Sequence, residues 1–140
     1  MMSRTRLLLA DDHLETAAQL RDLLEPEFDV IAHVTDGRAL IRDAARLLPD
    51  VIVSDISMPD LDGITAAVRI LERNPMARII FVSVHADPVL VERGLATGAL
   101  GYVLKLAAGD DLVPAVHAAL RGERHVSCGL QVEDQRRSRR

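Results

Sequence analysis

Short apolar runs alternate with longer stretches of helical period along almost the whole chain, and this alternation is what most narrows the fold. Five runs rich in Val, Ile and Leu predict strands, at residues 6–10, 30–34, 51–54, 78–83 and 101–105. The first, third and fourth runs are almost entirely apolar, which is typical of strands covered by helices on both faces. The alternation therefore predicts βα units around a parallel sheet.

The segments between the runs place apolar side chains on one face of a helix, so a helix is expected after each strand. These stripes and their end signals predict helices over residues 14–24, 40–48, 64–73, 89–97 and 110–121. Asp87 and Pro88 supply a cap and a first-turn proline for the fourth helix, and Gly98 supplies its stop. Five βα units in 140 residues predict an α/β fold with a doubly wound five-stranded parallel sheet, arranged as a three-layer sandwich.

Polar side chains follow four of the predicted strands. Asp11 and Asp12 follow the first strand, Asp55 the third, Ser83 ends the fourth and Lys105 ends the fifth. Ligands of doubly wound sheets bind at the carboxyl ends of the strands, so these groups are expected to meet at one edge. Crowded carboxylates repel one another unless a cation occupies the site, and oxygen ligands of this kind suit Mg²⁺.

This set of groups fits phosphoryl transfer to a carboxylate. A carboxylate beside a divalent cation can attack phosphorus and form an acyl phosphate. The cation and Lys105 would offset the charge of the phosphoryl oxygens, and the Ser83 hydroxyl would donate a hydrogen bond. Lys105 is the only lysine among 17 basic residues, which favours a role that a guanidinium does not fill.

The charges exclude some partners and favour a soluble protein. Residues 1–120 carry 11 basic and 18 acidic side chains, whereas residues 121–140 carry six basic and three acidic ones. An acidic body is a poor surface for phosphates, so we expect no direct DNA binding by this chain. No segment resembles a secretory signal or a membrane span, and the single Cys128 excludes an internal disulfide. We therefore expect a cytoplasmic protein that makes no membrane contact.

Four blocks of the sequence resemble the receiver domain of bacterial two-component response regulators, and most of all that of the NarL/FixJ type. The blocks are LLLADDH at 7–13, DVIVSDISMPDLDGI at 50–64, IIFVSVHAD at 79–87 and GALGYVLK at 98–105. The resemblance implies a flavodoxin/CheY-like sheet with strand order 2-1-3-4-5 and five helices. It also implies a receiver domain over residues 1–126, followed at 127–140 by a polar basic tail or the start of a linker, with no effector domain.

The resemblance assigns the central chemical role to Asp55. This residue matches the phosphoacceptor, which takes a phosphoryl group from a sensor histidine kinase or a histidine phosphotransfer protein. Asp11 and Asp12 match the acid pair that holds Mg²⁺ together with Asp55, and Ser57 matches the residue whose backbone carbonyl completes the site.

Three further residues match the switch machinery of the family. Ser83 and Lys105 match the groups that contact the phosphoryl oxygens, and Tyr102 matches the aromatic residue that turns inward when the hydroxyl is drawn to the phosphate. Such a protein is a signalling receiver rather than an enzyme, since it catalyses only its own phosphoryl transfer and dephosphorylation. Its helix 4/strand 5/helix 5 face would bind a second copy or a downstream protein.

Two alternatives remain at this point. The chain could be the N-terminal part of a NarL/FixJ-type transcription regulator, or a flavodoxin-like cofactor-binding or small hydrolase domain on the same topology. The second alternative lacks a Gly-rich phosphate loop after the first strand, where Asp11 and Asp12 would repel a phosphate. It also lacks the GxSxG sequence of a hydrolase around Ser83. His13 is interpreted as a polar residue at a helix start, and His85 as an exposed side chain.

Overall fold

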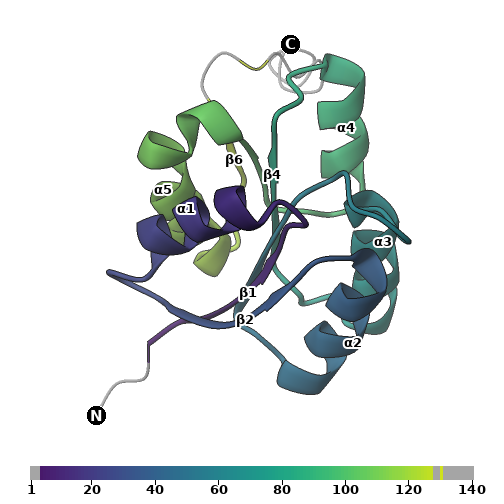
Figure 1. The fold of residues 1–140 in the computed structure, drawn as a ribbon. Helices are drawn as coiled ribbons and strands as arrows, with labels where there is room; N and C mark the ends of the chain where they lie inside the picture. The colour runs from purple at the N-terminus through teal and green to yellow at the C-terminus, as the bar shows by residue number, and fades with distance from the viewer. Residues whose placement is uncertain (1–3, 128–129, 131–140) are drawn as a thin grey trace.

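The computed structural model describes residues 4–127 and residue 130, which form one sheet covered by helices (Figure 1). The strands are β1 (Arg6–Ala10), β2 (Asp29–Val34), β3 (Val51–Ser54), β4 (Ile79–Ser83), β5 (Gly101–Leu104) and β6 (His125–Val126). The helices are α1 (Leu14–Leu24), α2 (Gly37–Leu47), α3 (Gly63–Arg73), α4 (Pro88–Ala96), the short 3₁₀ helix η1 (Lys105–Ala107) and α5 (Ala108–Leu120). The strand order is β2-β1-β3-β4-β5-β6, and every pairing is parallel.

The helices cover both faces of the sheet, as predicted. In Figure 1, α1 and α5 lie on one side of the sheet, and α2, α3 and α4 lie on the other. Successive residues of β1 alternate between the two cores: Leu7 and Leu9 pack with α1 and α5, whereas Leu8 and Ala10 pack with α2, α3 and α4. This alternation follows from the two-residue period of a strand and confirms the three-layer sandwich.

The end signals read from the sequence act as expected. The Asp87 carboxylate accepts a hydrogen bond of 3.0 Å from the Val89 amide at the start of α4, with Pro88 in the first turn. Gly98 has a φ of 104°, a conformation that favours glycine after a helix. Of the helices in the described part of the chain, none is both long and apolar enough to cross a membrane.

Several details differ from the predictions. The sheet has a sixth strand at His125–Val126. A strand of two residues is too short to produce a recognisable pattern in the sequence. The fifth strand ends at Leu104 rather than at Lys105, and α5 begins at Ala108 rather than near residue 110, because η1 leads directly into it.

Two leucines of the predicted helical stripes also lie outside the core. Leu14 is the first residue of α1 and is 70% exposed. Leu48 is 63% exposed because it follows α2 as a left-handed C-cap with a φ of 48°, a position where glycine is more usual.

Candidate functional site

The carboxyl ends of the parallel strands bring the predicted polar groups together. Asp11 follows β1, Asp55 follows β3, Ser83 ends β4 and Lys105 begins η1 directly after β5. Asp11 and Ser83 have no exposed surface, and Asp55 is 6% exposed. Since β1 pairs with β3 and β4 with β5, these groups occupy neighbouring positions along one edge of the sheet.

The backbone around Asp55 fixes its carboxylate. The Asp55 amide donates to the carbonyl of Ala10 on the neighbouring strand, at 2.8 Å. Oδ1 accepts hydrogen bonds from the amides of Ile56 at 2.7 Å and Ser57 at 3.3 Å. Gly63 packs so closely beneath this turn that a Cβ atom there would overlap the Asp55 carbonyl oxygen. The loop thus occupies Oδ1 and leaves Oδ2 for the groups across the site.

Lys105 provides the positive charge on the other side of Oδ2. Its Nζ lies 3.0 Å from Oδ2 of Asp55 and 3.1 Å from Oδ2 of Asp11, and its side chain is 12% exposed. Burial lowers the pKa of Lys105, but the hydrogen bonds and charges of Asp55 and Asp11 outweigh this effect, so its pKa is raised above 10.5. The single lysine of the chain therefore stays charged between two buried carboxylates.

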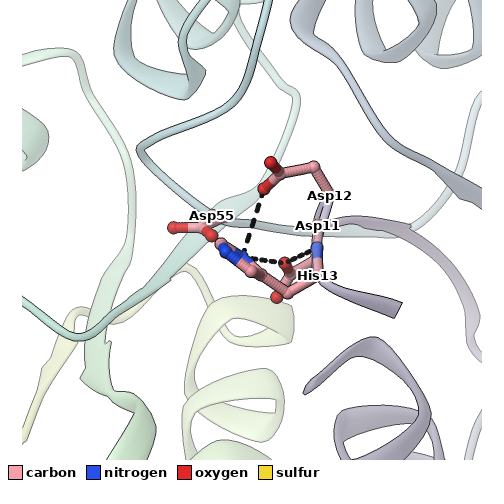
Figure 2. A group of neighbouring side chains, drawn as sticks. All are labelled: Asp11, Asp12, His13 and Asp55. Carbon is pink, nitrogen blue, oxygen red and sulfur yellow. Dashed lines mark hydrogen bonds and ion pairs between the residues drawn. The ribbon is translucent and has the colours of Figure 1, made fainter. Parts of the chain in front are cut away.

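A cluster of ligand atoms lies beside this ion pair. Figure 2 shows Asp11, Asp12, His13 and Asp55, whose nearest ligand atoms all lie within 4.8 Å of one another. Two ligands on opposite sides of one Mg²⁺ ion are about 4 Å apart, so the cluster already approaches the spacing that a single ion requires. The buried oxygens Asp11 Oδ2 and Asp12 Oδ1 have only charged or ring nitrogens nearby, Lys105 Nζ at 3.1 Å and His13 Nδ1 at 3.3 Å. A buried carboxylate cluster of this kind fits a divalent cation.

His13 is the member of this cluster that sequence reasoning missed. As predicted, it stands at the start of α1, but its ring does not cap the helix. Instead Nδ1 lies 3.5 Å from Asp11 and 3.3 Å from Asp12, while its amide donates to Asp11 Oδ1 at 2.9 Å. The only signal in the sequence was the DDH run itself, which places a nitrogen ligand directly after two aspartates.

The Ser57 amide donates to Oδ1 of Asp55, and the residue is exposed. It lines a shallow hollow beside the acidic cluster together with Asp12 and His13. That the backbone carbonyl of Ser57 binds Mg²⁺ stays a prediction.

Ser83 and Tyr102 meet at the loop that follows β4. The Ser83 hydroxyl accepts a hydrogen bond of 3.0 Å from the His85 amide, and the Tyr102 hydroxyl donates to the His85 carbonyl at 2.8 Å. Tyr102 has no exposed surface, so its ring faces inward. The His85 side chain is exposed as predicted, yet its backbone joins the two residues, a link that no side-chain pattern reveals.

Tyr102 is expected to ionise only above pH 10. Burial is the main cause of its raised pKa; the Ser83 hydroxyl opposes the shift, while the charges of Asp55 and Asp87 add to it. Because the chain has one tyrosine and no tryptophan, absorbance at 295 nm reports this phenol alone. The titration midpoint should lie above 10 in buffer and near 10 in urea.

The raised pKa of Tyr102 also determines how the stability of the folded protein changes at alkaline pH. The folded state holds the phenol proton more tightly than the unfolded state, so stability should fall as the pH rises through about 10. A folded-state midpoint at or below the midpoint in urea would contradict a buried, inward-facing ring.

Comparison with known proteins agrees with this fold. Residues 7–117 match the family described as response regulator receiver domain. The chain is 32% identical over 126 residues to the transcriptional regulatory protein DegU of Brevibacillus brevis, covering 89% of this chain and 53% of that protein. It is 36% identical to LiaR of Bacillus subtilis, covering 84% of this chain and 57% of that protein. The chain thus spans about half the length of these curated relatives.

Solved structures of response regulators are also similar to this chain. A LuxR-family two-component response regulator from Aurantimonas superposes with a TM-score of 0.89 at 30% identity, covering 96% of this chain and 99% of that one. The signal receiver domain of NarL from Mycobacterium tuberculosis superposes with a TM-score of 0.82 at 27% identity, covering 87% of this chain and all of that one.

The chain belongs to the response regulator receiver family, and is therefore a signalling module of two-component systems. Its relatives include regulators of the NarL/LuxR type, so the resemblance read from the four sequence blocks is confirmed. The receiver assignment is favoured over a flavodoxin-like cofactor binder or a small hydrolase.

Proposed function

We propose that Asp55 is the phosphoacceptor of this receiver and that a sensor histidine kinase or a histidine phosphotransfer protein is its donor. The observation that carries the proposal is the ammonium of Lys105, held 3.0 Å from Asp55 Oδ2 and 3.1 Å from Asp11 Oδ2. A buried cation between two carboxylates at a ligand-binding edge is the arrangement that stabilises an incoming phosphoryl group.

In the proposed reaction, Asp55 Oδ2 attacks the phosphorus of a phosphohistidine. A carboxylate oxygen–phosphorus bond forms while the phosphorus–nitrogen bond breaks, and the bonding pair returns to the donor imidazole. Lys105 then pairs with an oxygen of the bound phosphoryl group rather than with the free carboxylate. The Ser83 hydroxyl donates a hydrogen bond to a second oxygen, and leaves its present contact with the His85 amide to do so.

Asp11 and Asp12, with Asp55 and the Ser57 carbonyl, would hold Mg²⁺. The cation would neutralise charge that builds up on the transferring oxygens. This assignment rests on the clustering of the carboxylate oxygens of Asp11, Asp12 and Asp55 and on the preference of Mg²⁺ for oxygen ligands. The His13 ring nitrogen stands at the rim of the same cluster.

The output surface is proposed to be the face formed by α4, β5 and α5, and β5 carries Tyr102. A second copy of the chain or a downstream protein would bind there when Ser83 and Tyr102 change position. The sequence places the end of the receiver at residue 126 and a tail at 127–140. Because Ser127 is buried and bonds to β5, we propose that it belongs to the receiver, and that the residues after it form a basic tail or linker start that makes no direct DNA contact.

The test is phosphorylation by a small donor. The 140-residue chain is incubated with acetyl phosphate and Mg²⁺, and intact mass spectrometry counts the phosphoryl groups. We expect one acid-stable, base-labile adduct, located to Asp55 by reductive cleavage, and no adduct when EDTA removes the cation. An adduct on a different residue, or one that forms equally well in EDTA, would overturn the proposal.

A further inference from the structure

The outer edge of β5 is covered by the chain's own C-terminal segment. In a sheet of order 2-1-3-4-5, β5 would be an edge strand with unpaired backbone groups. Here the His125 amide donates to the Leu100 carbonyl at 2.9 Å, and β6 pairs with β5 in parallel. The His125 ring also lies against α5, with Nε2 3.7 Å from Asp111 Oδ1.

Ser127 makes the most specific contacts of this segment. Its amide donates to the Tyr102 carbonyl at 3.0 Å, and its hydroxyl accepts a hydrogen bond of 3.0 Å from the Leu104 amide. The residue is 2% exposed, so water does not compete for these bonds. One serine therefore holds β5 on both sides of Val103, with its side chain replacing the backbone acceptor that a longer strand would supply.

The two anchored positions are those on which the site depends. Tyr102 carries the ring that bonds to the His85 carbonyl beyond Ser83. Leu104 is followed directly by Lys105, whose Nζ must reach Asp55 and Asp11 across the site. A shift of the Leu104 backbone would move the base of the lysine side chain. Ser127 also lies beyond the segment that matches the family, which ends at residue 117.

We propose that Ser127 is a positioning residue for phosphoryl transfer, acting through the backbone of Leu104 to hold Lys105 against Asp55. The inference rests on the proposed function of Asp55. It extends the machinery of the receiver to a residue at the far end of the domain. It also links the C-terminal segment to the strand that carries Tyr102.

The test compares Ser127→Ala with Ser127→Thr in the full chain. Alanine removes the acceptor of the Leu104 amide, whereas threonine retains a hydroxyl. Thr97→Ala is the control, because the Thr97 hydroxyl also accepts a hydrogen bond from a backbone amide, that of Ala99 at 3.2 Å, and donates one to the Gly94 carbonyl at 2.7 Å, at the end of α4. The measurements are the rate constant of phosphorylation by acetyl phosphate, hydrogen exchange at Leu104 and the melting temperature.

Ser127→Ala should slow phosphorylation about fivefold, the effect of losing one net hydrogen bond, and should speed exchange at Leu104. Ser127→Thr should restore the rate, and Thr97→Ala should lower the melting temperature without slowing the reaction. The proposal is overturned if Ser127→Ala reacts at the wild-type rate, if threonine does not rescue it, or if Thr97→Ala is slowed equally. Labelling of the wild type at Asp55 separates this failure from failure of the proposed function.

Discussion

Replacement of Asp55 by asparagine should abolish the phosphoryl adduct while the fold persists. The amide is nearly the same size and its oxygen can still accept from the Ile56 amide, but it does not attack phosphorus as a carboxylate does. Lys105 keeps a partner because its Nζ also lies 3.1 Å from Asp11. We therefore expect labelling by acetyl phosphate to fall to the level measured in EDTA, with an unchanged circular dichroism spectrum.

The matched control for this variant is Asp22→Asn, which removes one carboxylate from the exposed surface of α1. It should label at the wild-type rate, so that any loss in the first variant reflects its position and not the net charge. If the Asp55→Asn protein labels as fast as this control, Asp55 is not the phosphoacceptor.

Replacement of Lys105 by glutamine should change cation binding and phosphoryl transfer in opposite directions. Without the ammonium, the phosphoryl oxygens lose a charge-stabilising contact, and the rate of adduct formation should fall by about 10²–10³. The same change removes a positive charge beside the acidic cluster. Mg²⁺ should bind at least about fivefold more tightly, since a unit charge a few ångström away contributes about 1–4 kcal/mol.

The stability of this variant should also come to depend on the cation. Asp11 and Asp55 are both buried, and without Lys105 they would face each other uncompensated. Melting curves with and without Mg²⁺ should therefore differ more for Lys105→Gln than for the wild type. Calorimetric titration with Mg²⁺ gives the affinity directly.

The control is Arg93→Gln, which removes an exposed cation from α4. It should leave the Mg²⁺ affinity and the labelling rate unchanged. If Lys105→Gln weakens Mg²⁺ binding, the lysine does not compete with the cation for the carboxylates, and the electrostatic account of the site is wrong.

The sheet and the position of the site could be predicted because each depends on a repeating pattern. The strands of the inner sheet are apolar on both faces, and their spacing by helical segments determines a parallel arrangement. That arrangement in turn places the residues after the strands at one edge, so Asp11, Asp55 and Lys105 meet as expected. No long-range contact had to be known for this step.

The features that sequence reasoning missed depend on single contacts rather than on patterns. The two residues of β6 carry no period, and they pair only because β5 offers a free edge. Ser127 is a polar residue in a segment without periodicity, so its burial against Leu104 follows from where the chain returns after α5. The same reasoning applies to His13, whose side chain could point to solvent or to the aspartates until the turn was known.

After α5 the chain returns to β5, and this brings parts of the receiver that are distant in sequence into direct contact. Leu104 and Ser127 are 23 positions apart, with all of α5 between them, yet one hydrogen bond joins them. A displacement of the β5 backbone thus reaches residue 127 without travelling through the helix. The residue that follows β6 and the residue that precedes Lys105 are therefore direct neighbours in space.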